Sequence, residues 1–328
     1  MTRVLVTGAT GFVGRRLCPK LLERGHDVVA TVRRLGLSSI PTGVDAAEIP
    51  DIGPDTDWTQ VLSGIDTVVH LAARVHVTRE GAADPSNAFG RINTEGTAVL
   101  ARAAATAGVG RFVHVSTSKV MGESSGNLPF CETDPPMPED AYGISKWGGE
   151  NALRDAARSM SMETVIVRPP LVYGPGVGAN FLTLLKVCRL ALPLPFAAIN
   201  NGRSIVYIDN LVDALIRCLE RPEAAGETYF VRDSEDLSTP ELIRRITAAM
   251  DRPARLFPFP ASLLRLAGRV TGNAATVNRA LGSLQVDDGK IRRHLGWTPS
   301  VDVVQGLQET VAWFTSRTGP RDDADITR

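Results

Sequence analysis

A tyrosine and a lysine four residues apart are the first candidates for chemistry in this sequence. Tyr142 and Lys146 stand in the segment YGISK, just after a proline-rich stretch. An i, i+4 spacing places both side chains on one face of a helix. A nearby ammonium group favours the phenolate, so we expect Lys146 to lower the pKa of Tyr142 from ~10 toward neutrality. Such a tyrosine can exchange a proton with the oxygen of an alcohol or ketone, although alone the pattern often marks only a helix start.

A second group of residues is typical of a phosphate-binding turn. The segment TGATGFVG, Thr7 to Gly14, follows an apolar strand-like run and precedes a helix-like one. The first glycine permits a tight turn, the second lets the backbone approach a pyrophosphate, and the third lets the helix pack on the strand. The phosphate then lies at the N-terminal N–H groups of the helix. We predict a dinucleotide-binding turn, the alternative being a plain strand-to-helix turn.

The end of the second predicted strand bears on the kind of dinucleotide. In NAD sites a carboxylate about 20 residues beyond the turn binds a ribose hydroxyl, whereas a nearby arginine accommodates the 2′-phosphate of NADP. The strand 27–32 ends without a carboxylate and is followed by Arg33 and Arg34. The sequence therefore favours NADP(H), with NAD(H) as the alternative if the two arginines form only a solvated loop.

The elements that must position these residues alternate regularly. Helix-like segments at 13–24, 93–107 and 142–158 separate apolar strand-like runs at 4–7, 27–32, 67–71, 111–116 and 164–168. Continuously apolar strands are typical of a parallel sheet that is covered on both faces. We predict an α/β fold with a doubly wound parallel sheet of the Rossmann type.

The second half becomes richer in proline and glycine and predicts a smaller α/β domain for the substrate. Amphipathic helices are predicted there at 239–250 and 261–270. We expect a Rossmann domain of residues 1–170 and about 203–222, a substrate domain of residues 171–202 and 223–318, and a frayed polar tail at 319–328.

Composition excludes several classes of partner. The 328 residues include 36 basic and 36 acidic side chains, so the formal net charge is zero, and we expect no nucleic-acid or anionic-membrane partner. No apolar run reaches the ~18 residues that a membrane span requires. Strand-like residues begin at Arg3, which leaves no room for a signal peptide, and the four cysteines lack zinc-ligand spacing. We expect a cytoplasmic protein without a metal site.

Together with further segments, these motifs resemble the extended short-chain dehydrogenase/reductase family, also called NAD-dependent epimerases and dehydratases. The family's segments occur here in order as TGATGFVG, DTVVHLAA at 66–73, NTEGT at 93–97, FVHVSTS at 112–118, YGISK, RPPLVYGPG at 168–176 and LGWTP at 295–299. Many relatives pair the helices 93–107 and 142–158 across a two-fold axis, so the resemblance implies a homodimer.

The resemblance also implies roles for the candidate residues. Tyr142 becomes the acid/base and Lys146 its pKa tuner and ribose anchor, while Thr117 binds the reacting oxygen. Thr117 is chosen by aligning the triplet 120–122 with the family's V-Y-G, from which Met121 departs. The expected cofactor-binding residues are Gly8, Thr10, Gly11, Phe12, Val13, Gly14, Arg33, Arg34, Asp51, Ile52, Leu71, Ala72, Ala73, Asn93, Val115, Tyr142, Lys146, Pro169 and Val172.

A nucleotide-sugar substrate is implied by features of the second half. An arginine suits a diphosphate because its guanidinium group can bind phosphate in a bidentate way. The expected substrate-binding residues are Arg74, Thr117, Ser118, Asn180, Pro195, Phe196, Arg203 and Arg279. For Arg203 the alternative is an ordinary ion pair, and His70 and His114, at the ends of buried strands, are interpreted as packed or hydrogen-bonded rather than catalytic.

The resemblance narrows the reaction. Sugar dehydratases of the family carry an Asp-Glu pair where this chain has Ser118 and Lys119, so we do not expect dehydration. Segments such as HLAARVHV, RPPLVYGPGV and GSLQVD resemble UDP-N-acetylquinovosamine-type dehydrogenases, which implies NAD(P)H-dependent reduction of the C4 ketone of a UDP-4-keto-6-deoxy-N-acetylhexosamine for surface polysaccharide (O-antigen) synthesis. The alternative is a UDP-hexose or UDP-N-acetylhexosamine 4-epimerase with tightly bound NAD. A non-catalytic cofactor sensor is disfavoured because Tyr142 and Lys146 are both present.

Overall fold

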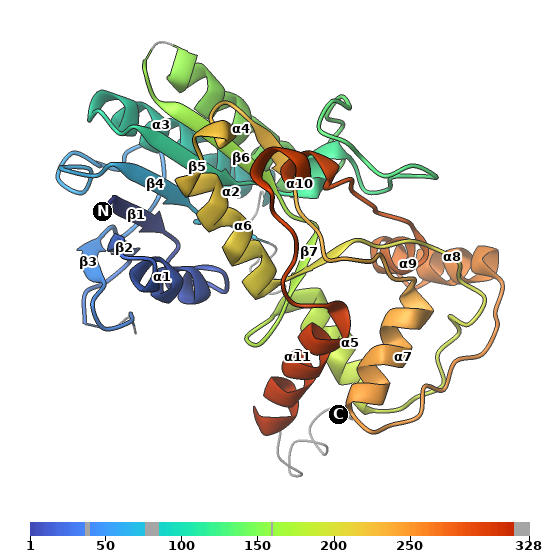
Figure 1. The fold of residues 1–328 in the computed structure, drawn as a ribbon. Helices are drawn as coiled ribbons and strands as arrows, with labels where there is room; N and C mark the ends of the chain where they lie inside the picture. Colours follow the sequence, from blue (N-terminus) through green and yellow to red (C-terminus); the bar gives the residue numbers. More distant parts are fainter. Residues whose placement is uncertain (37–39, 76–84, 159, 318–328) are drawn as a thin grey trace.

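A parallel sheet forms the centre of the larger part of the molecule (Figure 1). The computed structural model describes residues 1–36, 40–75, 85–158 and 160–317. Seven strands of this part of the chain form the sheet, in the order β3 (Asp45–Glu48), β2 (Asp27–Val32), β1 (Arg3–Thr7), β4 (Thr67–His70), β5 (Arg111–Val115), β6 (Glu163–Arg168) and β9 (Thr228–Phe230). All neighbours run parallel, which confirms the predicted doubly wound α/β fold. The strand order reverses between β1 and β4, where ligands of such sheets bind.

Alternate residues of each strand build two separate cores. On one face Val4 and Val6 of β1 pack with α1 (Gly14–Glu23) and α6 (Ile208–Glu220). On the other face Leu5 packs with α3 (Thr97–Thr106) and α4 (Ala141–Arg158). Because successive side chains of a strand point to opposite faces, the continuous apolar runs of the sequence serve both cores.

A second, smaller group of elements follows β6 (Figure 1). Its core includes Tyr173, Phe181, Ile246 and Leu307, which come from segments far apart in the chain. The strands are β7 (Leu171–Tyr173) and β8 (Ile205–Tyr207), which pair in parallel. The helices are α5 (Ala179–Arg189), α7 (Thr239–Ala249), α8 (Ala261–Val270), α9 (Ala274–Leu281) and α11 (Val303–Arg317). The helix α10 (Gly289–Leu295) instead packs Ile291 and Leu295 into the core of the large sheet, beside β9. The predicted helices 239–250 and 261–270 correspond to α7 and α8.

The division of the chain into two domains stays a prediction, and two strands bear on its boundaries. β9 falls in the range 223–318 assigned to the substrate domain, yet it pairs with β6 in the large sheet. β8 falls in the range 203–222 assigned to the Rossmann domain, yet it pairs with β7 outside that sheet. The predicted tail lies outside the described residues from 318 onward.

The helix predicted at 93–107 is irregular at its start. It begins as α2 (Pro85–Phe89), continues as a π-helix, η1 (Gly90–Gly96), and becomes regular only in α3. Short segments of this kind are common at functional sites. Two 3₁₀ turns, η2 (Ser118–Met121) and η3 (Pro222–Ala224), complete the elements. Across the described ranges, no helix combines the length and the apolar character that crossing a membrane would demand.

A buried ion pair fixes α4 to the sheet. Both oxygens of Glu150 accept from Arg168 on β6, at 2.9 Å from Nε and 2.7 Å from Nη2. Arg154 adds a 3.1 Å contact to the same carboxylate, and Nη1 of Arg168 lies 3.2 Å from Sδ of Met121. Met121, which departs from the family's V-Y-G pattern, thus packs against this pair. A bidentate pair gives geometric precision to the docking of a helix.

We expect Arg168→Met to lower the free energy of unfolding by about 3 kcal/mol, because it removes the bidentate partner of the buried carboxylate of Glu150. Urea denaturation followed by circular dichroism measures this loss. The matched control is Arg158→Met on α4, the helix that carries Glu150, because the ion pair between Arg158 and Asp155 is exposed. Equal losses in the two variants would contradict the assigned importance of the buried pair.

Candidate active site

The glycine-rich segment forms the predicted tight turn between β1 and α1. Gly8 has a φ of +71°, and a Cβ at this position would lie 2.7 Å from the backbone nitrogen of Ala72. A Cβ on Gly14 would lie 2.4 Å from the carbonyl oxygen of Gly8. Among the described residues no side chain caps α1 at Val13, and no acidic residue stands in its first turn. This helix start therefore suits an anion such as the pyrophosphate of a dinucleotide.

A chain of hydrogen bonds leads from this turn toward α4. The hydroxyl of Thr97 donates to the carbonyl of Asn93 at 2.8 Å, so its oxygen accepts from Nε2 of His70 at 3.1 Å. Nδ1 of His70 is then the acceptor for the hydroxyl of Thr7, 2.7 Å away. Asn93 donates from Nδ2 to Oγ of Ser145 at 2.9 Å, and this hydroxyl donates to the carbonyl of Tyr142 at 2.8 Å. The turn and the start of α4 are thereby connected.

The three predicted catalytic side chains come from neighbouring elements at the carboxyl end of the sheet. Thr117 follows β5 and caps η2, where its Oγ1 accepts from the backbone nitrogen of Lys119 at 3.3 Å. Tyr142 and Lys146 lie in the first two turns of α4, with Tyr142 half-buried and Lys146 only 1% exposed. The Nζ of Lys146 is 3.2 Å from Nε2 of His114.

The pKa of Tyr142 runs against the sequence-based expectation. Burial, with a smaller contribution from the carboxylate of Asp140, raises the pKa of Tyr142 to about 12. Burial also lowers the pKa of Lys146 to about 8, and Glu150 opposes this shift. Desolvation disfavours both charged forms, the phenolate of Tyr142 and the ammonium group of Lys146. Burial thus favours the neutral phenol of Tyr142.

The loop before α4 is fixed by Lys119, which occupies a position where sugar dehydratases have an acidic residue. Its Nζ contacts Asp140 at 2.6 Å and Glu123 at 2.7 Å. Asp140 in turn accepts from the backbone nitrogen of Gly143 at 2.6 Å and so caps α4. Lys119 thus orients the start of the helix that carries Tyr142.

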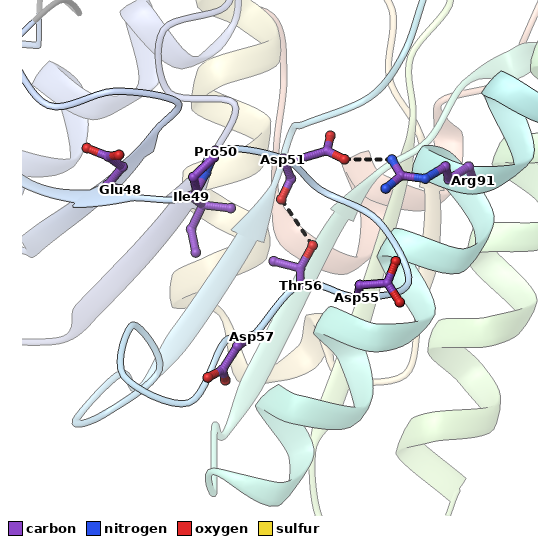
Figure 2. A pocket seen from close by; sticks show the side chains of 8 residues that line it. All are labelled: Glu48, Ile49, Pro50, Asp51, Asp55, Thr56, Asp57 and Arg91. Carbon is purple, nitrogen blue, oxygen red and sulfur yellow. Dashed lines mark hydrogen bonds and ion pairs between the residues drawn. The ribbon is translucent and has the colours of Figure 1, made fainter.

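A cavity of about 330 Å³ lies at the carboxyl end of β3 (Figure 2). Its lining includes Asp51, one of the expected cofactor-binding residues, whose carboxylate pairs with Arg91 of η1 at 2.6 Å. Ile52 packs against the core on the side of α3 and α4. The cavity is lined by Glu48, Ile49, Pro50, Asp51, Asp55, Thr56, Asp57 and Arg91.

The same cavity reveals a carboxylate that sequence reasoning missed. In the parallel register Val32, the last residue of β2, pairs with Glu48, the last residue of β3. Oε2 of Glu48 accepts from the backbone nitrogen of Leu35 at 2.9 Å, in the segment that follows β2. Arg33 and Arg34 are exposed, and within the described residues neither forms an ion pair. A carboxylate therefore lies beside the C-terminal end of β2, although the last residues of the strand and the two arginines that follow contain none.

Most of the other predicted cofactor residues follow the carboxyl ends of strands. Asn93 is buried, and its side chain exchanges two hydrogen bonds with the backbone of Arg74 at 2.8 and 3.0 Å. Ser118 donates its backbone N–H to the carbonyl of Pro169 at 2.9 Å, which joins the ends of β5 and β6. The residues near these strand ends are Leu71, Ala72, Ala73, Val115, Pro169 and Val172.

Two arginines predicted to bind phosphate lie near each other. Nη1 of Arg203 donates to the carbonyl of Arg279 at 2.7 Å and to that of Gly282 at 3.2 Å. Burial and the charge of Arg279 lower the pKa of Arg203, whereas Glu123 raises it. Two guanidinium groups that repel each other in a half-buried place suit an anionic ligand.

The remaining predicted substrate residues are more scattered along the smaller group of elements. Asn180 is exposed in the first turn of α5, directly after Ala179, whose φ is +48°. Pro195 and Phe196 are half-buried in a segment that pairs with residues 255–257: the backbone nitrogen of Leu194 donates to the carbonyl of Arg255 at 2.8 Å.

Comparisons with known proteins agree with this geometry. A family model described as the NAD dependent epimerase/dehydratase family matches residues 4–231. The chain is 39% identical to UDP-glucose 4-epimerase of Vibrio cholerae over 95% of each chain, and 32% identical to dTDP-glucose 4,6-dehydratase of Streptomyces griseus over 95% of this chain and 94% of that one. The solved UDP-glucuronic acid 4-epimerase of Bacillus cereus in complex with NAD matches with a TM-score of 0.77 at 25% identity, covering 95% of this chain and 96% of that chain. This protein therefore belongs to the NAD-dependent epimerase/dehydratase family, the extended short-chain dehydrogenases/reductases.

Proposed function

We propose that this protein is a UDP-sugar 4-epimerase that uses NAD and acts on a UDP-hexose or UDP-N-acetylhexosamine. The observation that carries the proposal is the grouping of Thr117, Tyr142 and Lys146 at the carboxyl end of the sheet. The Vibrio cholerae relative, a UDP-glucose 4-epimerase, supports this choice above the reductase that we favoured from the sequence.

The chain's own residues supply the proton chemistry and the binding. In its phenolate form, Tyr142 takes the proton of the sugar's O4 hydroxyl as C4 is oxidised, and the resulting phenol gives the proton back when the ketone is reduced. Thr117 offers a hydroxyl to the same oxygen, and the ammonium group of Lys146 offsets the negative charge that develops on Tyr142. When bound, NAD would supply the acceptor for the hydride that leaves C4, and its reduced form would supply the hydride that returns to the opposite face of the sugar.

Recognition of the UDP group falls to the second half of the site. Arg203 and Arg279 provide positive charge for a diphosphate. Arg203 lies within the range that the family model matches, and Arg279 lies beyond it. Phe196 and Pro195 offer apolar surface for a flat base.

A second candidate is the reduction of a UDP-4-keto-6-deoxy-N-acetylhexosamine. It is favoured by the raised pKa of Tyr142, because a protonated phenol is the form that donates to a ketone oxygen. The exposed Arg33 and Arg34 also suit a cofactor that is exchanged in each turnover.

The assay that separates the two candidates uses the purified protein with each substrate in parallel. We expect UDP-glucose or UDP-N-acetylglucosamine to be converted to its C4 epimer, detected by proton NMR, with NAD present and no net change in reduced nicotinamide. No epimer from either sugar, together with oxidation of NADH or NADPH by the 4-keto sugar, would replace the epimerase with the reductase.

We expect Tyr142→Phe to lower kcat about 10³-fold, because it removes the group that carries the proton. The dissociation constant of NADH, measured by fluorescence titration, should stay within twofold of wild type. Ile144→Ala, an exposed position on the same helix, is the control and should keep full activity. Activity that survives Tyr142→Phe means that another residue carries the proton.

Glu48 leads us to propose NAD rather than the NADP favoured from the sequence. A carboxylate beside the end of β2 can accept from a ribose hydroxyl and repels a 2′-phosphate. The NAD-bound structure of the Bacillus cereus relative supports the same choice.

We expect Glu48→Gln to tighten NADPH binding about tenfold relative to NADH, since one like-charge contact is removed. Fluorescence titration of both reduced cofactors gives the ratio. The control is Asp57→Asn, which removes a negative charge from the same cavity but can keep the hydrogen bond to the backbone nitrogen of Thr59. An unchanged ratio in Glu48→Gln, or an equal change in both variants, would assign the selectivity elsewhere.

A further inference from the structure

We propose that His114 is a positioning residue that holds the Nζ of Lys146 through a neutral imidazole ring, so that the lysine is fixed while its positive charge stays available. The inference rests on the proposed role of Lys146 at the site. Sequence reasoning treated His114 as a packed or hydrogen-bonded residue without a part in the reaction.

The contact is buried and built into the sheet. Nε2 of His114 lies 3.2 Å from Nζ of Lys146, and the two residues are 0% and 1% exposed. The register of β4 and β5 pairs His114 with His70, and the two rings stack with centroids 5.4 Å apart and planes at 25°. His70 is itself held by the hydroxyls of Thr7 and Thr97. The ring of His114 is therefore held in place by stacking on the fixed ring of His70.

Proton counting gives the direction of this hydrogen bond. Burial, with the positive charge of Lys146 as a second cause, lowers the pKa of His70 to about 3 and that of His114 well below its usual value. Both rings are therefore neutral. A lysine ammonium has only donors, so Nε2 of His114 accepts and the ring proton lies on Nδ1.

The other nitrogen of His114 forms no competing hydrogen bond. Nδ1 is buried and, among the described residues, has no hydrogen-bond partner. A buried donor without a partner is costly and rare, and it is tolerated mainly where another requirement fixes the side chain. In this ring the requirement is the contact between Nε2 and Lys146.

The charged groups around Lys146 explain why a neutral acceptor matters. On its own helix, Tyr142 lies one turn before it and Glu150 one turn after it, and Glu150 raises its pKa. The oxygens of Glu150 already accept from Arg168 of β6 and from Arg154. On the sheet side lie the neutral rings of His114 and His70. A carboxylate in place of His114 would form an ion pair and consume the charge that the phenolate of Tyr142 needs.

The first test reads the ring directly and needs no substrate. Long-range ¹H–¹⁵N NMR of the histidine rings should show His114 as the less common Nδ1–H tautomer in the wild-type protein. Lys146→Met removes the donor, and we expect His114 to change to the Nε2–H tautomer. An Nε2–H ring in the wild type, or no change in Lys146→Met, would overturn the proposal while leaving the proposed function intact.

The second test uses the pH dependence of kcat in the variants His114→Phe and His114→Gln. Activity requires the ammonium form of Lys146, so it falls as the pH rises through the pKa of this lysine. His114→Phe removes the acceptor that favours the ammonium form, and we expect the alkaline limb to move to lower pH by about one unit, with KM for the UDP-sugar within twofold.

His114→Gln is the matched variant, because its amide oxygen can accept from Nζ and should return the limb to near its wild-type position. Thermal melting of both variants controls for folding. If the alkaline limb of kcat lies at the same pH in the wild type and in His114→Phe, the role of His114 is in packing alone. The same conclusion follows if both variants move the limb by the same number of pH units. If neither variant folds, the tautomer measurement decides.

Discussion

The site depends on the hydrogen-bond chain that runs from Thr7 through His70, Thr97 and Asn93 to Ser145. Each member donates or accepts in one direction, so rotating one hydroxyl or ring would leave a buried polar group unpaired. The chain crosses from the glycine-rich turn to the start of α4. The position of a cofactor on the turn and the position of Tyr142 are therefore coupled by satisfied hydrogen bonds rather than by packing alone.

Two ion pairs complete the placement of α4. Lys119 holds Asp140, which caps the helix, and the pair of Glu150 and Arg168 docks its third turn on β6. Between these two points Lys146 is almost completely buried. Burying an unpaired ammonium is costly, and the lowered pKa of Lys146 reflects that cost. The neutral rings on the sheet side offer hydrogen bonding to this cation without cancelling it.

The electrostatics of the ligand side follow from local rather than overall charge. The chain is neutral overall, with 36 basic and 36 acidic residues. At the cavity beside β3, Glu48 accepts a hydrogen bond from the backbone nitrogen of Leu35, and Asp51 forms an ion pair with Arg91. Arg203 and Arg279 place two positive charges near each other, and the carboxylate of Glu123 opposes them.

The sequence by itself determined the parallel sheet, the glycine-rich turn and the spacing of Tyr142 and Lys146, because these are local patterns of apolar runs, glycine positions and helical periodicity. Tertiary structure decided the rest. β3 has the sequence Asp-Ala-Ala-Glu, which contains no β-branched residue, so the pairing of Glu48 with Val32 depends on register rather than on composition. The raised pKa of Tyr142 and the contact of Lys146 with His114 arise from burial between elements distant in sequence, and no local pattern records how much water a fold removes.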